Sequence, residues 1–335
     1  MRSETDNIHL VKAAFKKQFE ITMINNGVSA DAYLKKVNLP TADLDPESLL
    51  PEKPFWHLIN IVARDENMPD FGSLVAQTTP WHKVVSLAPL IHNSVSLKNL
   101  LEIFCDIASS QSSATGFTLE EKASHYTFSY AGMPLYKNDV QMELYRVTSM
   151  IQLVQLATGI EWFPGYIQLM MNKNSAIKTC GFLKNSEITF SNKTSVISIE
   201  KHCLHLPVNI DIPASLELRS KSEYDLDADF ANAIRQIMTA YIQNQHCSIE
   251  DIADIADISV RTLQRKLKKY DLKFNDLLNQ AKFIMAKEKL SDTEMHIYEI
   301  ANILGYSDAA NFTRAFHRWA GVSPGEYRQQ YQVVM

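Results

Sequence analysis

The chain has 335 residues and a formal net charge of −5 at neutral pH. This length predicts two domains, and the 46% share of hydrophobic residues excludes an intrinsically disordered chain. The sequence contains no apolar run of the roughly 18 residues that a membrane-spanning helix requires, and its polar start differs from a signal peptide, so we expect a cytoplasmic protein.

The first half of the chain is patterned mainly as helices. Apolar side chains at helical spacing predict helices over residues 8–26, 29–37, 55–66 and 96–107. Prolines interrupt the stretch from Pro40 to Pro54, which is therefore expected to be a loop. A second irregular connection is expected around Pro80-Trp81-His82.

Strand-like segments follow. Alternating apolar and polar residues predict an antiparallel pair of strands over residues 115–122 and 124–131. A long helix is expected from Asp139 to Thr158, ended by Gly159, and three more strands at residues 166–171, 188–190 and 195–200. The predicted fold class is α+β, in which an N-terminal domain of helices and antiparallel sheet precedes an all-α domain.

A polar, proline-containing segment separates the two predicted domains. We place the N-terminal domain at residues 1–205, a linker at 206–227 and the C-terminal domain at 228–335. The C-terminal domain holds 13 basic and 13 acidic residues, so the whole net charge of −5 lies in residues 1–227. An acidic N-terminal domain is not expected to bind nucleic acid itself.

The C-terminal domain contains one helix-turn-helix pattern twice, at about residues 248–269 and 297–319. Each copy opens on Ile-Ala-x-Ile, passes through a short turn ending in serine, and closes on an arginine flanked by large apolar residues. Ser259 and Ser307 are the expected N-caps of the second helices. The helix expected between the copies, residues 274–290, has a length of about 25 Å, which with its flanking turns can hold the second helices about one DNA turn apart.

The second helix of each copy has an apolar face and an outward polar face. The predicted apolar faces are Val260, Leu263, Leu267 and Tyr270 in the first copy, and Ala309, Phe312, Phe316 and Trp319 in the second. Arg265 and Arg314 lie at the centres of the outward faces, and the segment from Ser259 to Lys273 carries six basic residues against one acidic residue. A single such helix is usually just a solvated surface, but the repetition and the local charge together favour DNA binding.

We therefore assign two sets of DNA-contacting residues. Arginine, glutamine, asparagine and threonine can hydrogen-bond base edges, and the predicted base-reading residues are Arg261, Gln264, Arg265, Asn311, Thr313 and Arg314. The predicted phosphate contacts are Lys268, Lys269, His317 and Arg318.

The last hundred residues resemble the paired helix-turn-helix domain of the AraC/XylS family of bacterial transcription regulators. The resemblance rests on residues 259–267 and, almost throughout, on residues 300–328. Two positions depart from the family pattern: Asp257 stands where glycine is frequent, and Lys282 where arginine is common. The resemblance implies a sequence-specific regulator, expected to be an activator, whose partners are promoter DNA and RNA polymerase.

Residues 54–205 are similar, more loosely, to the effector-binding and dimerisation domain of one branch of that family. The segments that carry this similarity are Ser86–Leu90, Ser96–Leu101 and Trp162-Phe163-Pro164. The resemblance implies a small-molecule effector and a homodimer, but it names neither the effector nor its binding residues. A protein partner acting on this domain is the alternative form of control.

Two features of the N-terminal domain leave alternatives open. Trp81 and His82 either line a pocket or pack as a loop corner. Arg146 either pairs with an anionic effector or forms a salt bridge with Glu143 or another carboxylate.

An enzyme carrying a DNA-targeting tail is the competing class of function. Such a protein would need an activated, usually metal-bound cysteine, whereas the four cysteines here are scattered. The sequence also lacks a nucleotide-binding glycine loop, a Gly-x-Ser-x-Gly elbow and a His-Glu-x-x-His motif. We therefore predict no catalytic residue, no metal site and no cofactor.

Overall fold

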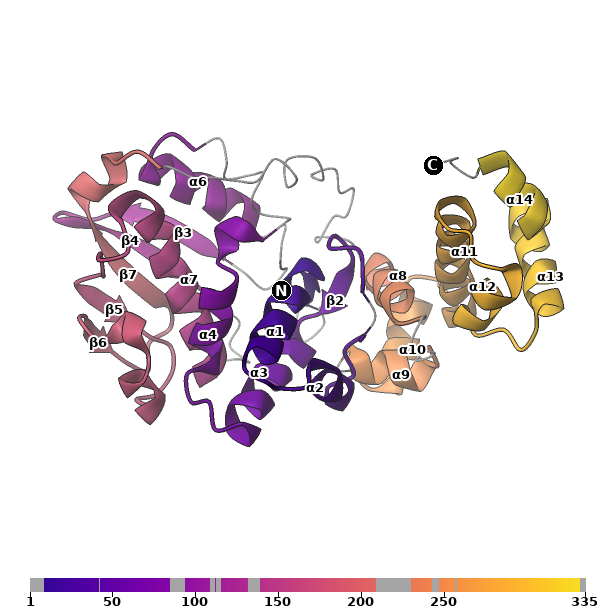
Figure 1. Ribbon diagram of the computed structural model, residues 1–335, viewed down its shortest axis with the longest axis horizontal. Coiled ribbons are helices and arrows are strands. Elements are labelled where there is room, and N and C mark those ends of the chain that lie inside the picture. Colours follow the sequence, from indigo (N-terminus) through magenta and orange to yellow (C-terminus); the bar gives the residue numbers. More distant parts are fainter. Residues whose placement is uncertain are drawn as a thin grey trace.

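The computed structural model describes residues 9–41, 43–84, 94–108, 112, 116–131, 139–208, 230–242, 247–256 and 258–331. An α+β region formed by the first two hundred residues lies beside a helical C-terminal region along the long axis of the molecule (Figure 1). Three sequence features fall outside the described residues: nearly all of the expected linker at 206–227, Ser86–Leu90 and Asp257. No helix in the described ranges is long and apolar enough to cross a membrane.

A five-stranded sheet of order β3-β4-β7-β5-β6 forms one end of the molecule. Its strands are β3 (Phe117–Glu121), β4 (His125–Tyr130), β5 (Tyr166–Gln168), β6 (Glu187–Thr189) and β7 (Ser195–Glu200). The predicted antiparallel pairing of the first two is confirmed, with Leu119 opposite Phe128. All pairs are antiparallel except β5 and β6, which run parallel. Alternation in a sequence predicts which face of a strand is buried, but it does not predict strand direction.

The long helix α7 (Val140–Thr158) is the centre of the N-terminal region. The Asp139 side chain caps it by accepting a hydrogen bond from the Met142 N–H, and Gly159 ends it with φ = 88°, as the sequence indicates. Most of its residues are buried because the sheet and the helices α3 (Lys53–Asp65) and α4 (Phe71–Thr78) pack around it. Helix α4 was not predicted from the sequence.

A two-stranded antiparallel sheet, β1 (Leu10–Lys12) with β2 (Leu49–Pro51), corrects two expectations. The predicted helix at residues 8–26 begins as a strand, and only its later part is helical, as α1 (Ala14–Asn25). The predicted loop at residues 40–54 contains β2 and the start of α3. A three-residue strand is defined by the segment with which it pairs, so the local sequence pattern did not reveal β1 or β2. Proline is compatible with the first turn of a helix, so the prolines near residue 54 did not exclude the start of α3.

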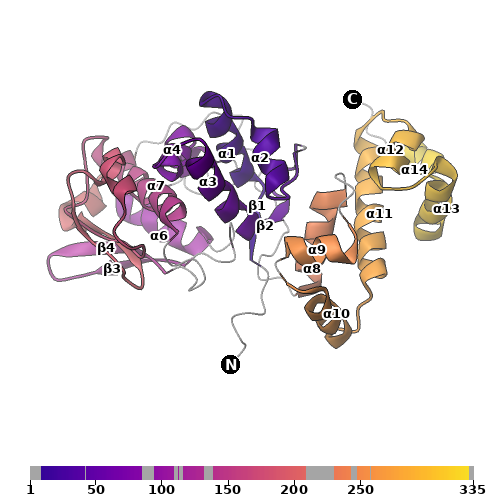
Figure 2. The same ribbon diagram turned by 90° about the horizontal axis from the view of Figure 1, so that it is seen from below.

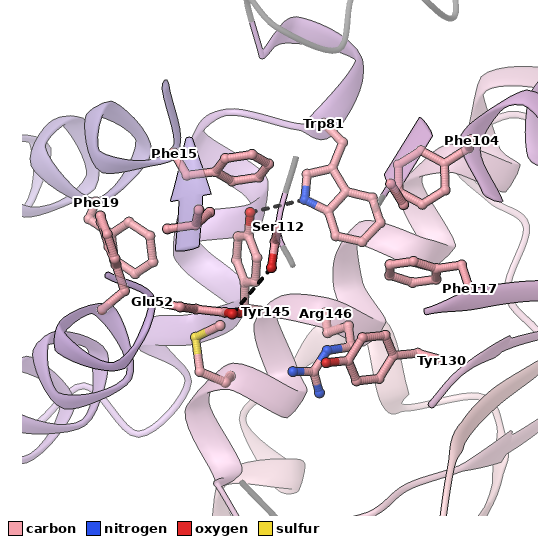
Figure 3. A pocket seen from close by; sticks show the side chains of 14 residues that line it. Phe15, Phe19, Glu52, Trp81, Phe104, Ser112, Phe117, Tyr130, Tyr145 and Arg146 are labelled. Atoms are coloured by element: carbon pink, nitrogen blue, oxygen red, sulfur yellow. Dashed lines mark hydrogen bonds between the residues drawn. The ribbon is translucent and has the colours of Figure 1, made fainter. Parts of the chain in front are cut away.

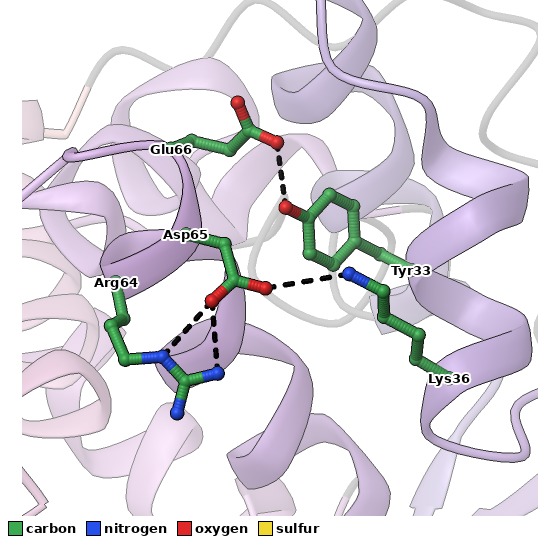
Figure 4. Close-up of polar contacts among 5 residues, drawn as sticks. All are labelled: Tyr33, Lys36, Arg64, Asp65 and Glu66. Carbon is green, nitrogen blue, oxygen red and sulfur yellow. Dashed lines mark hydrogen bonds and ion pairs between the residues drawn. The ribbon is translucent and has the colours of Figure 1, made fainter.

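Helix α2 (Ala30–Lys36) is held against the end of α3 by polar contacts (Figure 4). The Tyr33 hydroxyl donates to Glu66 at 2.6 Å, and Lys36 pairs with Asp65 at 3.4 Å. The hydrogen bond to Glu66 is the main reason that the pKa of Tyr33 rises to about 12. These contacts fix the position of Asn38, which follows α2.

Seven helices make up the described C-terminal region: α8 (Phe230–Tyr241), α9 (Ile249–Ile255), α10 (Val260–Lys269), α11 (Phe274–Asp292), α12 (Ile297–Ile303), α13 (Ala309–Ala320) and α14 (Pro324–Tyr331). Helix α11 has 19 residues, a length of about 28 Å. It lies between α10 and α13 in both ribbon views (Figures 1 and 2). Helix α8 packs against α11 and also against β2, so it touches both regions of the protein.

Candidate nucleic-acid interface and effector pocket

The two helix-turn-helix units, α9–α10 and α12–α13, are built on equivalent cores. The apolar residues at matching positions are at most 3% exposed: Ile252 and Ile300, Ala253 and Ala301, Leu263 and Phe312, Leu267 and Phe316. Tyr270 was predicted to lie on the same apolar face but is 47% exposed, because it is the C-cap of α10 and lies beyond its last turn. The repeated sequence thus folds into a repeated pair of helices.

The helix caps fit one prediction and correct another. Ser259 caps α10, its Oγ accepting a hydrogen bond from the Thr262 N–H at 3.1 Å. Helix α13 is capped by Asp308 and not by Ser307, since the Asp308 carboxylate accepts from the Asn311 N–H. The second copy has one extra residue before its first large apolar residue, and that residue moves the cap one position along the chain.

The turn of the second unit is held by the connecting helix. Gly305 adopts φ = 73°, a left-handed conformation that glycine enters without strain. Lys282 on α11 places its Nζ 4.6 Å from the centre of the Tyr306 ring, and burial lowers its pKa. Lys282 therefore links α11 to this turn through a cation–π contact.

All ten predicted DNA-contacting residues lie at least partly on the surface. Eight are exposed: Arg261, Gln264, Arg265, Lys268, Lys269, Arg314, His317 and Arg318. Asn311 and Thr313 are half-buried, and the Thr313 hydroxyl donates to the Ala309 carbonyl of its own helix at 2.7 Å. The Arg314 guanidinium donates to the Asn311 side chain, which orients the arginine along the outward face of α13.

Asp254, an acidic residue of α9, contacts the N-terminal region of the protein. Asp254 is exposed and accepts a hydrogen bond from the Asn38 side chain of the N-terminal region at 3.2 Å. This hydrogen bond is therefore a contact between the N-terminal and C-terminal regions of the protein.

Comparison with protein-family models identifies residues 252–330 as a helix-turn-helix domain. The matched residues begin in α9 and end in α14, so they include both units and the helix between them. This is an AraC-type helix-turn-helix domain.

Several bacterial regulators resemble the chain that carries this AraC-type domain. The HTH-type transcriptional regulator VirS of Mycobacterium tuberculosis is 22% identical over 310 residues, which cover 88% of this chain and 89% of VirS. The HTH-type transcriptional activator CsvR of Escherichia coli is 33% identical over 76 residues, 23% of this chain and 28% of CsvR. The structure of the transcriptional regulator CdpR from Pseudomonas aeruginosa aligns with 93% of this chain and 98% of its own, at 17% identity and a TM-score of 0.38. The protein is a DNA-binding transcriptional regulator of the AraC type.

Beyond the AraC-type domain, the N-terminal region encloses a cavity of about 680 Å³, including the part open to solvent. Eight of its fourteen lining residues are aromatic: Phe15, Phe19, Phe55, Trp81, Phe104, Phe117, Tyr130 and Tyr145. They come from helices, strands and the short 3-10 helix Trp81–Lys83, and they converge on one space (Figure 3). The lining is mostly apolar with a few polar groups, as is typical of small-molecule sites.

Hydrogen bonds fix the position of Trp81 in this wall. Its indole N–H donates to the Tyr145 hydroxyl at 2.9 Å, and that hydroxyl donates to Gln18 at 3.0 Å. The Trp81 ring also stacks on Phe104, with 4.9 Å between ring centres. Trp81 therefore lines the cavity, whereas His82 is not among the lining residues.

Arg146 lines the cavity and forms the salt bridge to Glu143 that the sequence offered as one alternative, at 2.9 Å. Its guanidinium also lies 3.8 Å from the centre of the Tyr130 ring. Glu143 accepts two further hydrogen bonds, from the Met170 N–H at 2.9 Å and the Ser195 hydroxyl at 2.6 Å.

Glu52 is the cavity residue that the sequence did not reveal. It is 6% exposed and accepts a hydrogen bond from the Ser112 hydroxyl at 3.2 Å. Burial raises its pKa to about 7, although the charge of Arg146 acts in the opposite direction. Because residues 40–54 were expected to be a loop, Glu52 was not predicted to be buried. The apolar pair Leu49-Leu50 just before it was the available signal.

Proposed function

We propose that the protein is a sequence-specific activator that binds promoter DNA through α10 and α13 and is controlled by a small molecule in the N-terminal cavity. The observation that carries the DNA-binding part is the pair of equivalent helices, each presenting an exposed arginine at the same position of the same fold. Because one rigid helix, α11, joins the units, a single chain can place both in successive major grooves. Homodimer formation and contact with RNA polymerase belong to the same proposal.

Control by a small molecule is supported by a continuous set of packed elements. Glu52, which lines the cavity, directly follows β2, and α8 packs on β2 and on α11. A ligand that moves Glu52 would therefore act on the strand beneath α8 and, through α8, on the helix between the two DNA-reading units. The contact between Asn38 and Asp254 provides a second point at which the regions meet.

The base-reading assignment predicts a specific loss for Arg265→Ala. Arginine contacts a guanine edge through two hydrogen bonds, so its removal is expected to cost about 1–3 kcal/mol of operator binding and to relax base preference at one position. Bound genomic fragments are first recovered with the unaltered protein, and affinities are then measured by fluorescence anisotropy on a recovered operator and its single-base variants.

Arg64→Ala is the matched control, because Arg64 is also an exposed arginine but lies on α3. It is expected to leave affinity and base preference unchanged. Unaltered affinity and base preference in Arg265→Ala would remove that residue from the DNA interface.

Lys269→Ala is expected to behave differently. A phosphate contact carries no sequence information, so binding should weaken equally on operator and on unrelated DNA. The slope of log affinity against log salt concentration should fall by roughly one. Lys173→Ala, an exposed lysine of the N-terminal region, serves as control. A loss confined to the operator would instead make Lys269 a base-reading residue.

A further inference from the structure

Glu52 is a carboxyl group of the N-terminal cavity that forms no ion pair with a described residue. Two other buried carboxylates and one half-buried carboxylate of this region already form ion pairs: Glu20 with Lys16 at 3.0 Å, Glu143 with Arg146 at 2.9 Å, and the half-buried Glu47 with Lys12 at 2.7 Å. Within the described residues Glu52 has no such pair, and its carboxylate accepts a hydrogen bond from the Ser112 hydroxyl. A cation entering the cavity would therefore meet an uncompensated carboxyl group.

The cationic group of the cavity is poorly placed to receive an anion. Arg146 pairs with Glu143 and packs over the ring of Tyr130, with the Trp56 ring 5.4 Å away. Glu143 is itself held by hydrogen bonds from Met170 and Ser195, so it cannot move aside without leaving those groups unsatisfied. A carboxylate ligand would have to compete with Glu143 for the guanidinium.

The walls favour a cation with an apolar body. Aromatic faces carry negative potential, and they attract ammonium and guanidinium groups most strongly where water is excluded. The Arg146 guanidinium over Tyr130 is one instance of this contact inside the cavity. Around Glu52, Figure 3 shows the rings of Phe15, Phe19 and Tyr145 on one side, and those of Trp81, Phe104 and Phe117 on the other.

We propose that the cavity binds a small organic amine in its protonated form, with the ammonium group on the Glu52 carboxylate and the apolar body among the aromatic rings. This inference rests on the proposed function, since it names the chemical class of the effector. Binding of an ammonium ion requires Glu52 to be ionised, so the ligand and the proton compete for the same carboxylate. The charged and titratable groups facing Glu52 are Arg146, Tyr130 and Tyr145, and the positive charge of Arg146 is offset by Glu143.

The test compares three probes of nearly equal size: phenethylamine, phenethyl alcohol and hydrocinnamate. Each is titrated into the full chain by isothermal titration calorimetry at about pH 6 and about pH 8. Phenethylamine is expected to bind most tightly and to gain about tenfold in affinity between the two pH values, because the ionised fraction of Glu52 rises by that factor. The affinity of the carboxylate probe, hydrocinnamate, would instead fall between about pH 6 and about pH 8.

Glu52→Gln should remove the pH dependence and weaken the amine at pH 8 by tenfold or more. Glu102→Gln replaces an exposed carboxylate of α6 (Leu97–Ala108) and should change neither the pH dependence of amine binding nor the affinity at pH 8. Tighter binding of hydrocinnamate than of phenethylamine, equal amine binding by Glu52→Gln, or no binding of any probe would overturn the proposal. The pH response of the unaltered chain decides the question even if Glu52→Gln fails to fold. Because Arg265→Ala should weaken operator binding and relax base preference while leaving amine binding intact, failure of this inference is distinguishable from failure of the regulator assignment.

Discussion

Replacing Gly72 by alanine is expected to destabilise the N-terminal region by at least about 3 kcal/mol. Gly72 lies in α4 where that helix meets α7, and a Cβ atom at this position would stand 1.8 Å from the backbone carbonyl oxygen of Gln141. A backbone oxygen cannot turn away as a side chain can. The two helices would have to separate, breaking the hydrogen bonds from the Gly72 N–H to the Gln141 side chain at 2.9 Å and between Ser73 and Thr148 at 2.9 Å.

The direction of this effect distinguishes packing from helix propensity. Alanine is favoured over glycine inside a helix by about 1 kcal/mol, so propensity alone would make the variant more stable. The expected result is a melting temperature lower by roughly 6–12 °C. Gly165→Ala is the control, since a Cβ there would meet nothing within 4 Å. A Gly72→Ala protein as stable as the unaltered chain would mean that α4 and α7 lie farther apart.

The second large effect is a pH-dependent gain in stability from Glu52→Gln. Burial raises the pKa of the folded-state carboxyl to about 7 from an ordinary value of 4.5. A group with a raised folded pKa contributes stability that is fully present below its unfolded pKa and is lost as the pH rises through its folded pKa. The unaltered protein should therefore lose about 3 kcal/mol of unfolding free energy from this group between about pH 5 and pH 8.

Glutamine does not ionise, so the unfolding free energy of the variant does not fall with pH at this position. The difference in unfolding free energy between Glu52→Gln and the unaltered chain, measured by urea denaturation, should grow in favour of the variant by about 3 kcal/mol over that range. Other titrating groups cancel in the difference. Glu102→Gln should show a constant difference, and a constant difference for Glu52→Gln would show that the carboxyl is solvated.

The DNA-binding helices could be predicted from the sequence because their signals are local. A core position such as Leu263 or Phe312 is identified by its spacing from neighbours three and four residues away, and a cap such as Ser259 by its place at the start of that pattern. The exception, Asp308 in place of Ser307, arose from a single inserted residue that shifted the cap without altering the core.

The cavity could not be predicted in the same way. Its lining runs from Val11 to Arg146 and combines residues from α1, α3, α6, α7 and the strands β3 and β4. The sequence pattern of these segments does not indicate a cavity. An aromatic residue that lines a cavity and one that packs in the core have the same spacing along the chain. Arg146 illustrates the limit: the sequence offered two partners for it, and only the packing of α7 against the sheet selected Glu143.

The sequence by itself therefore determined that two helix-turn-helix units, each with an arginine on its outward face, follow a mixed α+β region. Those features depend on residues a few positions apart along the chain. The tertiary structure alone decided that Glu52 is buried opposite aromatic rings and that α8 joins β2 to α11. Desolvation of a carboxyl group and contact between distant elements depend on which segments fold against one another, and neighbouring residues in the sequence do not encode that choice.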